Sequence, residues 1–264
     1  MSKAVLRRGA PIGQGQEPLI CAPLVARQLP ALAAEAAAVA ARRPDLIEWR
    51  VDFFDAIADL DQVLAGAAAV RAAIGAIPLI FTRRSIREGG EPIALDETQV
   101  VAMQQAICAS GLVDFLDCEL SCAAPHFQAS ADAARRHGVG LIASFHDFQR
   151  TPPAADIVAR FHQAAAAGAD IAKVAVMPRT LDDVLTLLGA TLQGAREVEL
   201  PLITMSMGPY GVLTRLFGWM FGSSVSFAVG EAASAPGQVP IDDMRRVLDV
   251  LHRSLGKGAM SARQ

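Results

Sequence analysis

The sequence has few cysteines, and their placement matches no metal-binding pattern. Four occur in 264 residues, at Cys21, Cys108, Cys118 and Cys122. Cys118 and Cys122 are four positions apart, but no pair of histidines lies near them to complete a zinc site. We therefore expect free thiols, no metal site and a reducing compartment, the cytoplasm.

The chain also lacks a strong excess of charge of either sign. Its formal net charge is -3 and it contains no basic run, so nothing indicates a nucleic-acid partner. The apolar stretch 31–41 is short and contains Glu35, so it is not suited to span a bilayer. No apolar core follows the basic residues of segment 1–9, as a signal peptide would require. We expect no partner that is a nucleic acid or a membrane.

Hydrophobic residues make up 52% of the chain, which is enough to fill one large core. No internal break marks a second domain, so we predict a single domain over residues 1–264. Its first part, 1–17, is largely polar and contains several glycines. We expect a short N-terminal hairpin or arm there.

Apolar segments typical of buried strands alternate with alanine-rich segments typical of helices. The eight predicted strands are 19–23, 45–52, 77–84, 113–119, 139–146, 169–176, 202–205 and 224–228. Predicted helices include 31–43, 96–110, 125–137, 155–167, 181–192 and 241–255. Eight such units predict an α/β fold, a single (β/α)8 TIM barrel. The competing open, doubly wound sheet would favour a glycine-rich turn after its first strand, and residues 21–25 contain no glycine.

Lys173 lies in the middle of the apolar strand 169–176. Burial disfavours a charged ammonium and lowers its pKa, which leaves a free amine able to attack a ketone and form a Schiff base. A structural alternative is a lysine that reaches solvent or pairs with a carboxylate. The strand by itself leaves both interpretations open.

Charged side chains gather at the ends of the predicted strands, where barrels place their reacting groups. Alternation puts Glu48, Arg50 and Asp52 on one face of strand 45–52. They are expected either to contact a ligand or to form a buried salt bridge between Glu48 and Arg50. Asp117 and Glu119, at the end of strand 113–119, are expected to support a charge network.

Arginines lie at the end of the predicted strand 77–84, at positions 83 and 84, and just after it, at position 87, close to the pair Gly89-Gly90. The guanidinium fork suits an oxygen-rich substrate, although a solvated charged loop would have the same composition.

Three later segments complete the polar set. His146 ends the strand before that of Lys173, so the two side chains are expected to meet, and histidine moves protons near neutral pH. Arg215 follows a glycine-containing turn in the region where such barrels bind anions. Segment 234–238, with Ser234 and Gln238, is predicted to be a mobile lid or, alternatively, an ordinary loop.

In this order, the motifs resemble those of type I 3-dehydroquinate dehydratases, the Schiff-base enzymes of the shikimate pathway. The resemblance runs from residue 19 to residue 255. The segments that carry it are 48–52, 81–82, 84–85, 88–90, 144–148, 172–173, 206–208 leading to Arg215, and 234–238. Cys21 stands where the family often has serine, so no substrate contact is expected of it.

The resemblance implies dehydration of 3-dehydroquinate to 3-dehydroshikimate, with no metal or organic cofactor, by an enzyme that is commonly a homodimer. Lys173 would form the imine, His146 would remove and return a proton, and Glu88 would support His146. Arg215 would hold the substrate carboxylate. The residues expected to bind substrate are Glu48, Arg50, Arg84, Arg215, Ser234 and Gln238.

Two alternatives remain at this level. One is another Schiff-base barrel, of the aldolase type, that acts on a keto acid or sugar phosphate. The other is a binding or regulatory protein that has kept the barrel and lost catalysis. The joint presence of Lys173, His146 and Glu88 speaks against the second.

Overall fold

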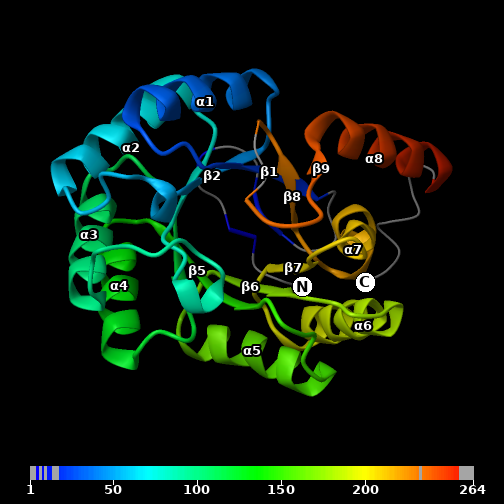
Figure 1. The fold of residues 1–264 in the computed structure, drawn as a ribbon. Coiled ribbons are helices and arrows are strands. Elements are labelled where there is room, and N and C mark those ends of the chain that lie inside the picture. Colours follow the sequence, from blue (N-terminus) through cyan, green and yellow to red (C-terminus); the bar gives the residue numbers. More distant parts are fainter. Residues whose placement is uncertain (1–3, 6–7, 9–10, 14–17, 232–233, 256–264) are drawn as a thin grey trace.

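The computed structural model describes residues 4–5, 8, 11–13, 18–231 and 234–255. Parallel strands alternate with helices along the chain, and the helices form an outer layer around the curled sheet (Figure 1). The strands are β1 (Leu19–Leu24), β2 (Leu46–Arg50), β3 (Leu79–Thr82), β4 (Phe115–Glu119), β5 (Gly140–Asp147), β6 (Ile171–Val176), β7 (Leu202–Ser206) and β8 (Val225–Val229). The helices are α1 (Leu29–Ala41), α2 (Leu60–Ile74), α3 (Glu97–Ala109), α4 (Ala124–Arg136), α5 (Ala154–Ala166), α6 (Leu181–Glu197), α7 (Gly211–Phe217) and α8 (Ile241–Leu255).

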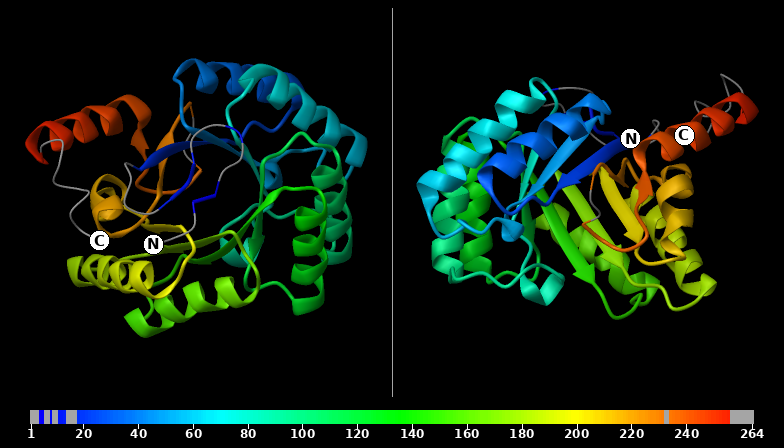
Figure 2. Two further views of the ribbon diagram at one scale, coloured as in Figure 1. Left: turned by 180° about the vertical axis from the view of Figure 1, so that it is seen from behind. Right: turned by 45° about the horizontal axis from the view of Figure 1, so that its top comes forward.

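The sheet curls until its two ends meet. Its order is β7-β6-β5-β4-β3-β2-β1-β8-β9, where β9 is the two-residue strand Val239–Pro240. Between β7 and β8 the ring is closed by a parallel bridge from Leu202 to Ser223 and by a 2.7 Å hydrogen bond from Ser224 N to Leu202 O. The predicted barrel is therefore confirmed, and Figure 2 shows its helices from two further sides.

Two hydrophobic layers follow from the alternation of side chains along each strand. Outward residues such as Ile47, Trp49 and Val51 pack against the helices in the larger cluster. Inward residues fill the amino-terminal end of the barrel, for example Leu46, Ile80, Phe115, Ile142, Ile171 and Ile203. The polar residues lie further along the strands, so this apolar layer fills the barrel beneath their carboxyl ends.

The N-terminal arm is described only in part. Val5 and Ile12 form an antiparallel bridge with two hydrogen bonds of 2.8 and 2.9 Å, and both side chains join the inner cluster. The rest of the expected hairpin, residues 1–3, 6–7, 9–10 and 14–17, lies outside the described residues.

Some element boundaries differ from those predicted. β3 ends at Thr82, two residues before the predicted end, because the chain leaves the sheet there to enter the 3-10 turn Ile86–Glu88. α6 extends to Glu197, beyond the predicted residue 192. The helix passes through Gly194, where a side chain would collide with Phe161 of α5, so glycine permits the two helices to pack closely. Within the described ranges, no helix has the length and hydropathy to cross a membrane.

Candidate active site

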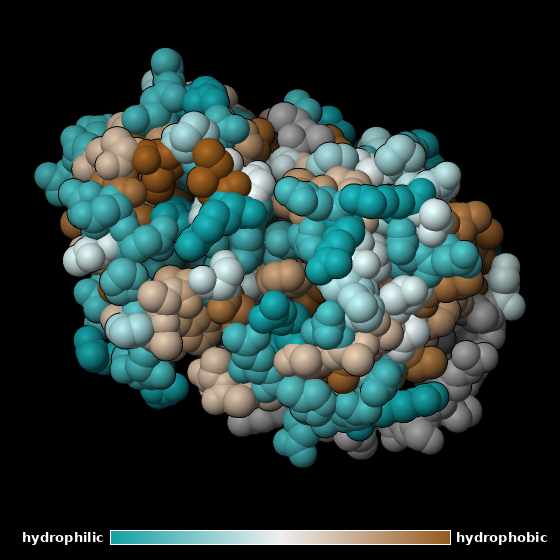
Figure 3. All heavy atoms as spheres, turned by 60° about the horizontal axis from the view of Figure 1, so that its bottom comes forward, coloured by the Kyte–Doolittle hydropathy of each residue, from teal (hydrophilic) through white to brown (hydrophobic). Residues whose placement is uncertain are grey.

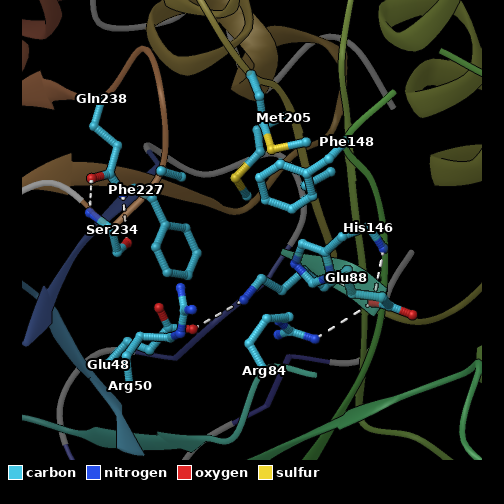
Figure 4. A pocket seen from close by; sticks show the side chains of 14 residues that line it. Glu48, Arg50, Arg84, Glu88, His146, Phe148, Met205, Phe227, Ser234 and Gln238 are labelled. Carbon is cyan, nitrogen blue, oxygen red and sulfur yellow. Dashed lines mark hydrogen bonds and ion pairs between the residues drawn. The ribbon is translucent and has the colours of Figure 1, made fainter. Parts of the chain in front are cut away.

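A cavity opens at the carboxyl end of the barrel strands and includes about 430 Å³ of unfilled space, part of it open to solvent. Its walls come from strands and loops far apart in the sequence (Figure 4). The lining residues used below are Glu48, Arg50, Arg84, Glu88, His146, Lys173, Phe227, Ser234 and Gln238. Eight of the nine expected site residues are among them, and Arg215 is not.

The amine of Lys173 lies between two carboxylates. Nζ is 3.1 Å from Oε1 of Glu48 and 3.0 Å from Oδ2 of Asp117, and the side chain is 5% exposed. The ring of Phe227 lies 4.6 Å from Nζ. β6 is apolar and buried, as predicted, and inward carboxylates of β2 and β4 reach the amine. Pairing with a carboxylate was one of the two interpretations that the strand by itself left open.

Arg84 joins the acids of neighbouring strands. Its guanidinium donates to Oδ1 of Asp117 at 2.7 Å, to Oε1 of Glu119 at 3.0 Å and to Oγ of Ser144 at 2.9 Å. Burial acts to raise the pKa of Asp117, but the cations Arg84 and Lys173 hold it well below its usual range. Asp117 and Glu119 thus belong to a charge network, and Asp117 also contacts the amine directly.

His146 is held by Glu88. Its Nδ1 is 2.9 Å from Oε2 of Glu88, its backbone N–H donates to the same oxygen at 3.0 Å, and Oε1 of Glu88 accepts from the hydroxyl of Ser121. Burial, with the nearby cations Arg84 and Lys173, lowers the pKa of His146 well below its usual value, so the imidazole is neutral near pH 7. Burial likewise raises the pKa of Glu88. A proton on Nδ1 directed at Glu88 leaves the lone pair of Nε2 available as an acceptor.

Arg50 pairs with Asp52. The buried salt bridge between Arg50 and Glu48, one of the two alternatives from the sequence, is not formed. Nε and Nη2 of Arg50 donate to the two oxygens of Asp52 at 2.8 and 2.7 Å. Asp52 also accepts from the backbone N–H groups of Arg84 and Glu91 at 3.3 and 3.1 Å. This aspartate fixes the loop after β3 to the end of β2, and Glu48 is left free to contact Lys173 and Thr82.

Arg215 lies behind the cavity wall. Its guanidinium donates to the carbonyl oxygens of Phe227 and Pro236 at 3.1 and 3.3 Å, and burial lowers its pKa to about 10. Ser234 and Gln238 line the cavity and contact one another, with Oε1 of Gln238 accepting from Ser234 N at 3.0 Å. Arg215 therefore holds the lid segment through Pro236 in this structure.

Four contacts were not anticipated: those of Ser144, Thr82, Phe227 and Ser121 with the charged groups. The sequence could have identified Ser144 and Thr82, because each lies near the end of a strand whose inward face is polar. No sequence pattern identifies Ser121, because its contact with Glu88 depends on how two loops meet. Cys21 is fully buried in the inner cluster and does not line the cavity.

Comparison with known proteins reveals close relatives. The family model for type I 3-dehydroquinase matches residues 20–254. A 3-dehydroquinate dehydratase of Aromatoleum aromaticum is 56% identical over 255 residues, 97% of this chain and 98% of that protein. The crystal structure of the 3-dehydroquinate dehydratase of Geobacillus kaustophilus superposes with a TM-score of 0.92 at 49% identity, covering 94% of this chain and 96% of that one. The type I enzyme of Clostridium difficile, solved with covalently modified comenic acid, also gives 0.92, at 37% identity and with 96% and 100% covered.

Replacement of Asp117 by asparagine tests the buried charge network. We expect D117N to lower the free energy of unfolding by about 3–5 kcal/mol, because Arg84 and Lys173 lose the carboxylate between them. A depressed folded-state pKa means that this stabilisation is present above the pKa of the unfolded aspartate and is lost as the pH falls through the folded one. The difference between wild type and variant should therefore shrink in acid. Urea denaturation at several pH values measures it.

The matched control is Asp132, whose ion pair with Arg135 is largely exposed. D132N should change the free energy of unfolding by no more than about 1 kcal/mol. Equal effects of D117N and D132N would contradict a stabilising role for the network.

Proposed function

The chain belongs to the type I 3-dehydroquinase family and is a hydro-lyase with 3-dehydroquinate dehydratase activity, and we propose that it acts through an imine on Lys173 with His146 as acid and base. One observation carries this proposal. The chain has three lysines, at 3, 173 and 257, and Lys173 lines the same cavity as a histidine whose ring is held by a carboxylate. The alternative function, that of an aldolase-type barrel, is not supported by the relatives described above, which are 3-dehydroquinate dehydratases.

Imine formation begins at Nζ of Lys173. The ammonium first loses a proton, for which Glu48 at 3.1 Å offers an acceptor. The amine then adds to the ketone carbon, and the carbinolamine loses water to leave a protonated imine. The carboxylates of Glu48 and Asp117 offset the positive charge of this imine, as they offset that of the ammonium.

Proton abstraction follows at the carbon beside the imine. Nε2 of His146 takes the proton, and the electron pair moves toward the imine nitrogen to give an enamine. The enamine expels the hydroxyl group, to which His146 returns the proton, and water then hydrolyses the conjugated imine. The nitrogen serves as the electron sink, so the reaction needs no metal or organic cofactor.

Glu88 positions His146 and keeps its proton on Nδ1, and Ser121 orients Glu88 in turn. Arg50 and Arg84 present donors to the substrate oxygens, while Ser234 and Gln238 close over them. The expected contact between Arg215 and the substrate carboxylate requires the segment around Pro236 to move, and it stays a prediction. The cytoplasmic location predicted from the sequence also stays a prediction, and the four cysteines are free thiols, as such a location requires.

Apolar side chains exposed on α6 and α7 support a homodimer. Leu181 and Leu185, one turn apart on α6, are 55% and 64% exposed. Tyr210, just before α7, and Leu213, on α7, are exposed as well. Figure 3, in which the underside of Figure 1 comes forward, shows apolar groups in small patches among hydrophilic ones. We infer that α6 and α7 form the contact between two copies, since exposed leucines of this kind gain free energy when covered.

Reduction with borohydride in the presence of 3-dehydroquinate should inactivate the enzyme and add one reduced substrate-derived group to Lys173. Borohydride converts an imine into a stable secondary amine, so intact mass followed by peptide mapping locates it. K173R should take up no label, while K3R and K257R should label as wild type does. Label on Lys3 or Lys257 would refute the assignment.

Replacement of His146 by alanine should lower kcat by about 10²–10⁴-fold and still permit imine formation, because the base and not the nucleophile is removed. Steady-state turnover and borohydride trapping measure the two steps separately. The control is H162A, since His162 is exposed and pairs with Glu197 outside the cavity. Turnover of H146A equal to that of H162A would remove His146 from the mechanism.

Light scattering should give a mass twice that of the 27.8 kDa chain. L185E should shift the enzyme toward the monomer, because a carboxylate in an apolar contact is left without a partner. V250E is the control, since Val250 is 51% exposed on α8, a helix that is not part of the proposed interface. A monomeric wild type, or dissociation by V250E alone, would overturn this interface.

A further inference from the structure

A second cluster of metal-ligating side chains lies apart from the cavity, where the loop after β4 meets the start of α3. Glu97 is the first residue of α3, Cys122 lies in the turn before α4, and His126 is in the first turn of α4. One ligand atom from each of the three lies within 4.8 Å of the other two, and all three residues are half-buried. We propose that Glu97, Cys122 and His126 form a zinc-binding site.

The types of ligand atom in the cluster favour Zn²⁺ over other metal ions. A thiolate, an imidazole and a carboxylate are the ligands that Zn²⁺ takes in proteins, and three of them leave a fourth position for water. Two anionic ligands balance the charge of the ion. Bond lengths of about 2.0–2.3 Å place tetrahedral ligand atoms roughly 3.3–3.8 Å apart, so these atoms need to close by at most about 1.5 Å on binding. Glu97, with a side chain 37% exposed, is free to make that adjustment.

The surroundings of the three side chains suit ligation. Nη2 of Arg83 donates to Oε1 of Glu97, which orients the carboxylate and leaves its second oxygen to the metal, as outer-shell partners of metal ligands do. Nδ1 of His126 is buried and has no hydrogen-bond partner among the described residues. Buried polar atoms are normally satisfied, so this imidazole has a position left to fill.

The site lies back to back with the cavity. Arg84 points to Asp117 while Arg83, its neighbour, points to Glu97. Ser121 contacts Glu88 while Cys122, the next residue, turns toward His126. None of the three proposed ligands lines the cavity, so their replacement should leave turnover in a chelating buffer unchanged and thereby show that each variant is folded.

The test uses the full-length, tag-free enzyme, stripped with a chelator and titrated with Zn²⁺ against a chromophoric competitor. One ion should bind per chain, and C122S, H126A and E97Q should each weaken binding at least about tenfold. Co²⁺ in place of Zn²⁺ should give a thiolate-to-metal absorption band that C122S abolishes.

Matched controls come from the same two helices. C108A removes a cysteine near the far end of α3, and H137A removes the histidine that directly follows α4. Both variants should bind Zn²⁺ as wild type does. Absence of binding in the wild type, unchanged binding in C122S or H126A, or equal losses in the controls would each overturn the site.

Discussion

Much of this structure depends on the placement of Asp117 between two buried cations. Its oxygens contact Arg84 at 2.7 Å and Lys173 at 3.0 Å, with no solvent access to the carboxylate. Isolated charges are costly in such a place, and each of these is acceptable only because the others are present. The same contacts give the site its chemistry, since they hold an amine, a guanidinium and several acids within one small cavity.

The barrel makes this arrangement available. Parallel strands bring residues of equal register together, so Thr82 lies beside Asp117 and Ser144 beside Lys173. Hydrophobic side chains occupy the inward positions two residues earlier on the strands and exclude water from below. Loops then contribute Glu88, Ser234 and Gln238 from outside the sheet. The rigid strands hold the charged core of the site, and the loops add further side chains around it.

The loops after β3 and β4 serve two faces of the molecule at once. Consecutive residues diverge there: Arg84 and Ser121 turn to the catalytic cavity, and Arg83 and Cys122 turn to the cluster at Glu97. A zinc ion at that cluster would stand one residue from the serine that orients Glu88. The two sites therefore share backbone, although they share no side chain.

The sequence by itself determined the alternation of strands and helices, the place of Lys173 within an apolar strand and the position of His146 at the end of the preceding strand. These features depend on local periodicity and on the order of elements, and both can be read directly from a single sequence. Only the tertiary structure decided the partners: Asp52 for Arg50, Asp117 for Lys173, backbone carbonyls for Arg215, and Glu97 beside Cys122 and His126. Charge pairing depends on distances of a few ångströms between residues that can be far apart in the sequence, such as Glu48 and Lys173, 125 positions apart. Those distances exist only once the ring of strands has closed.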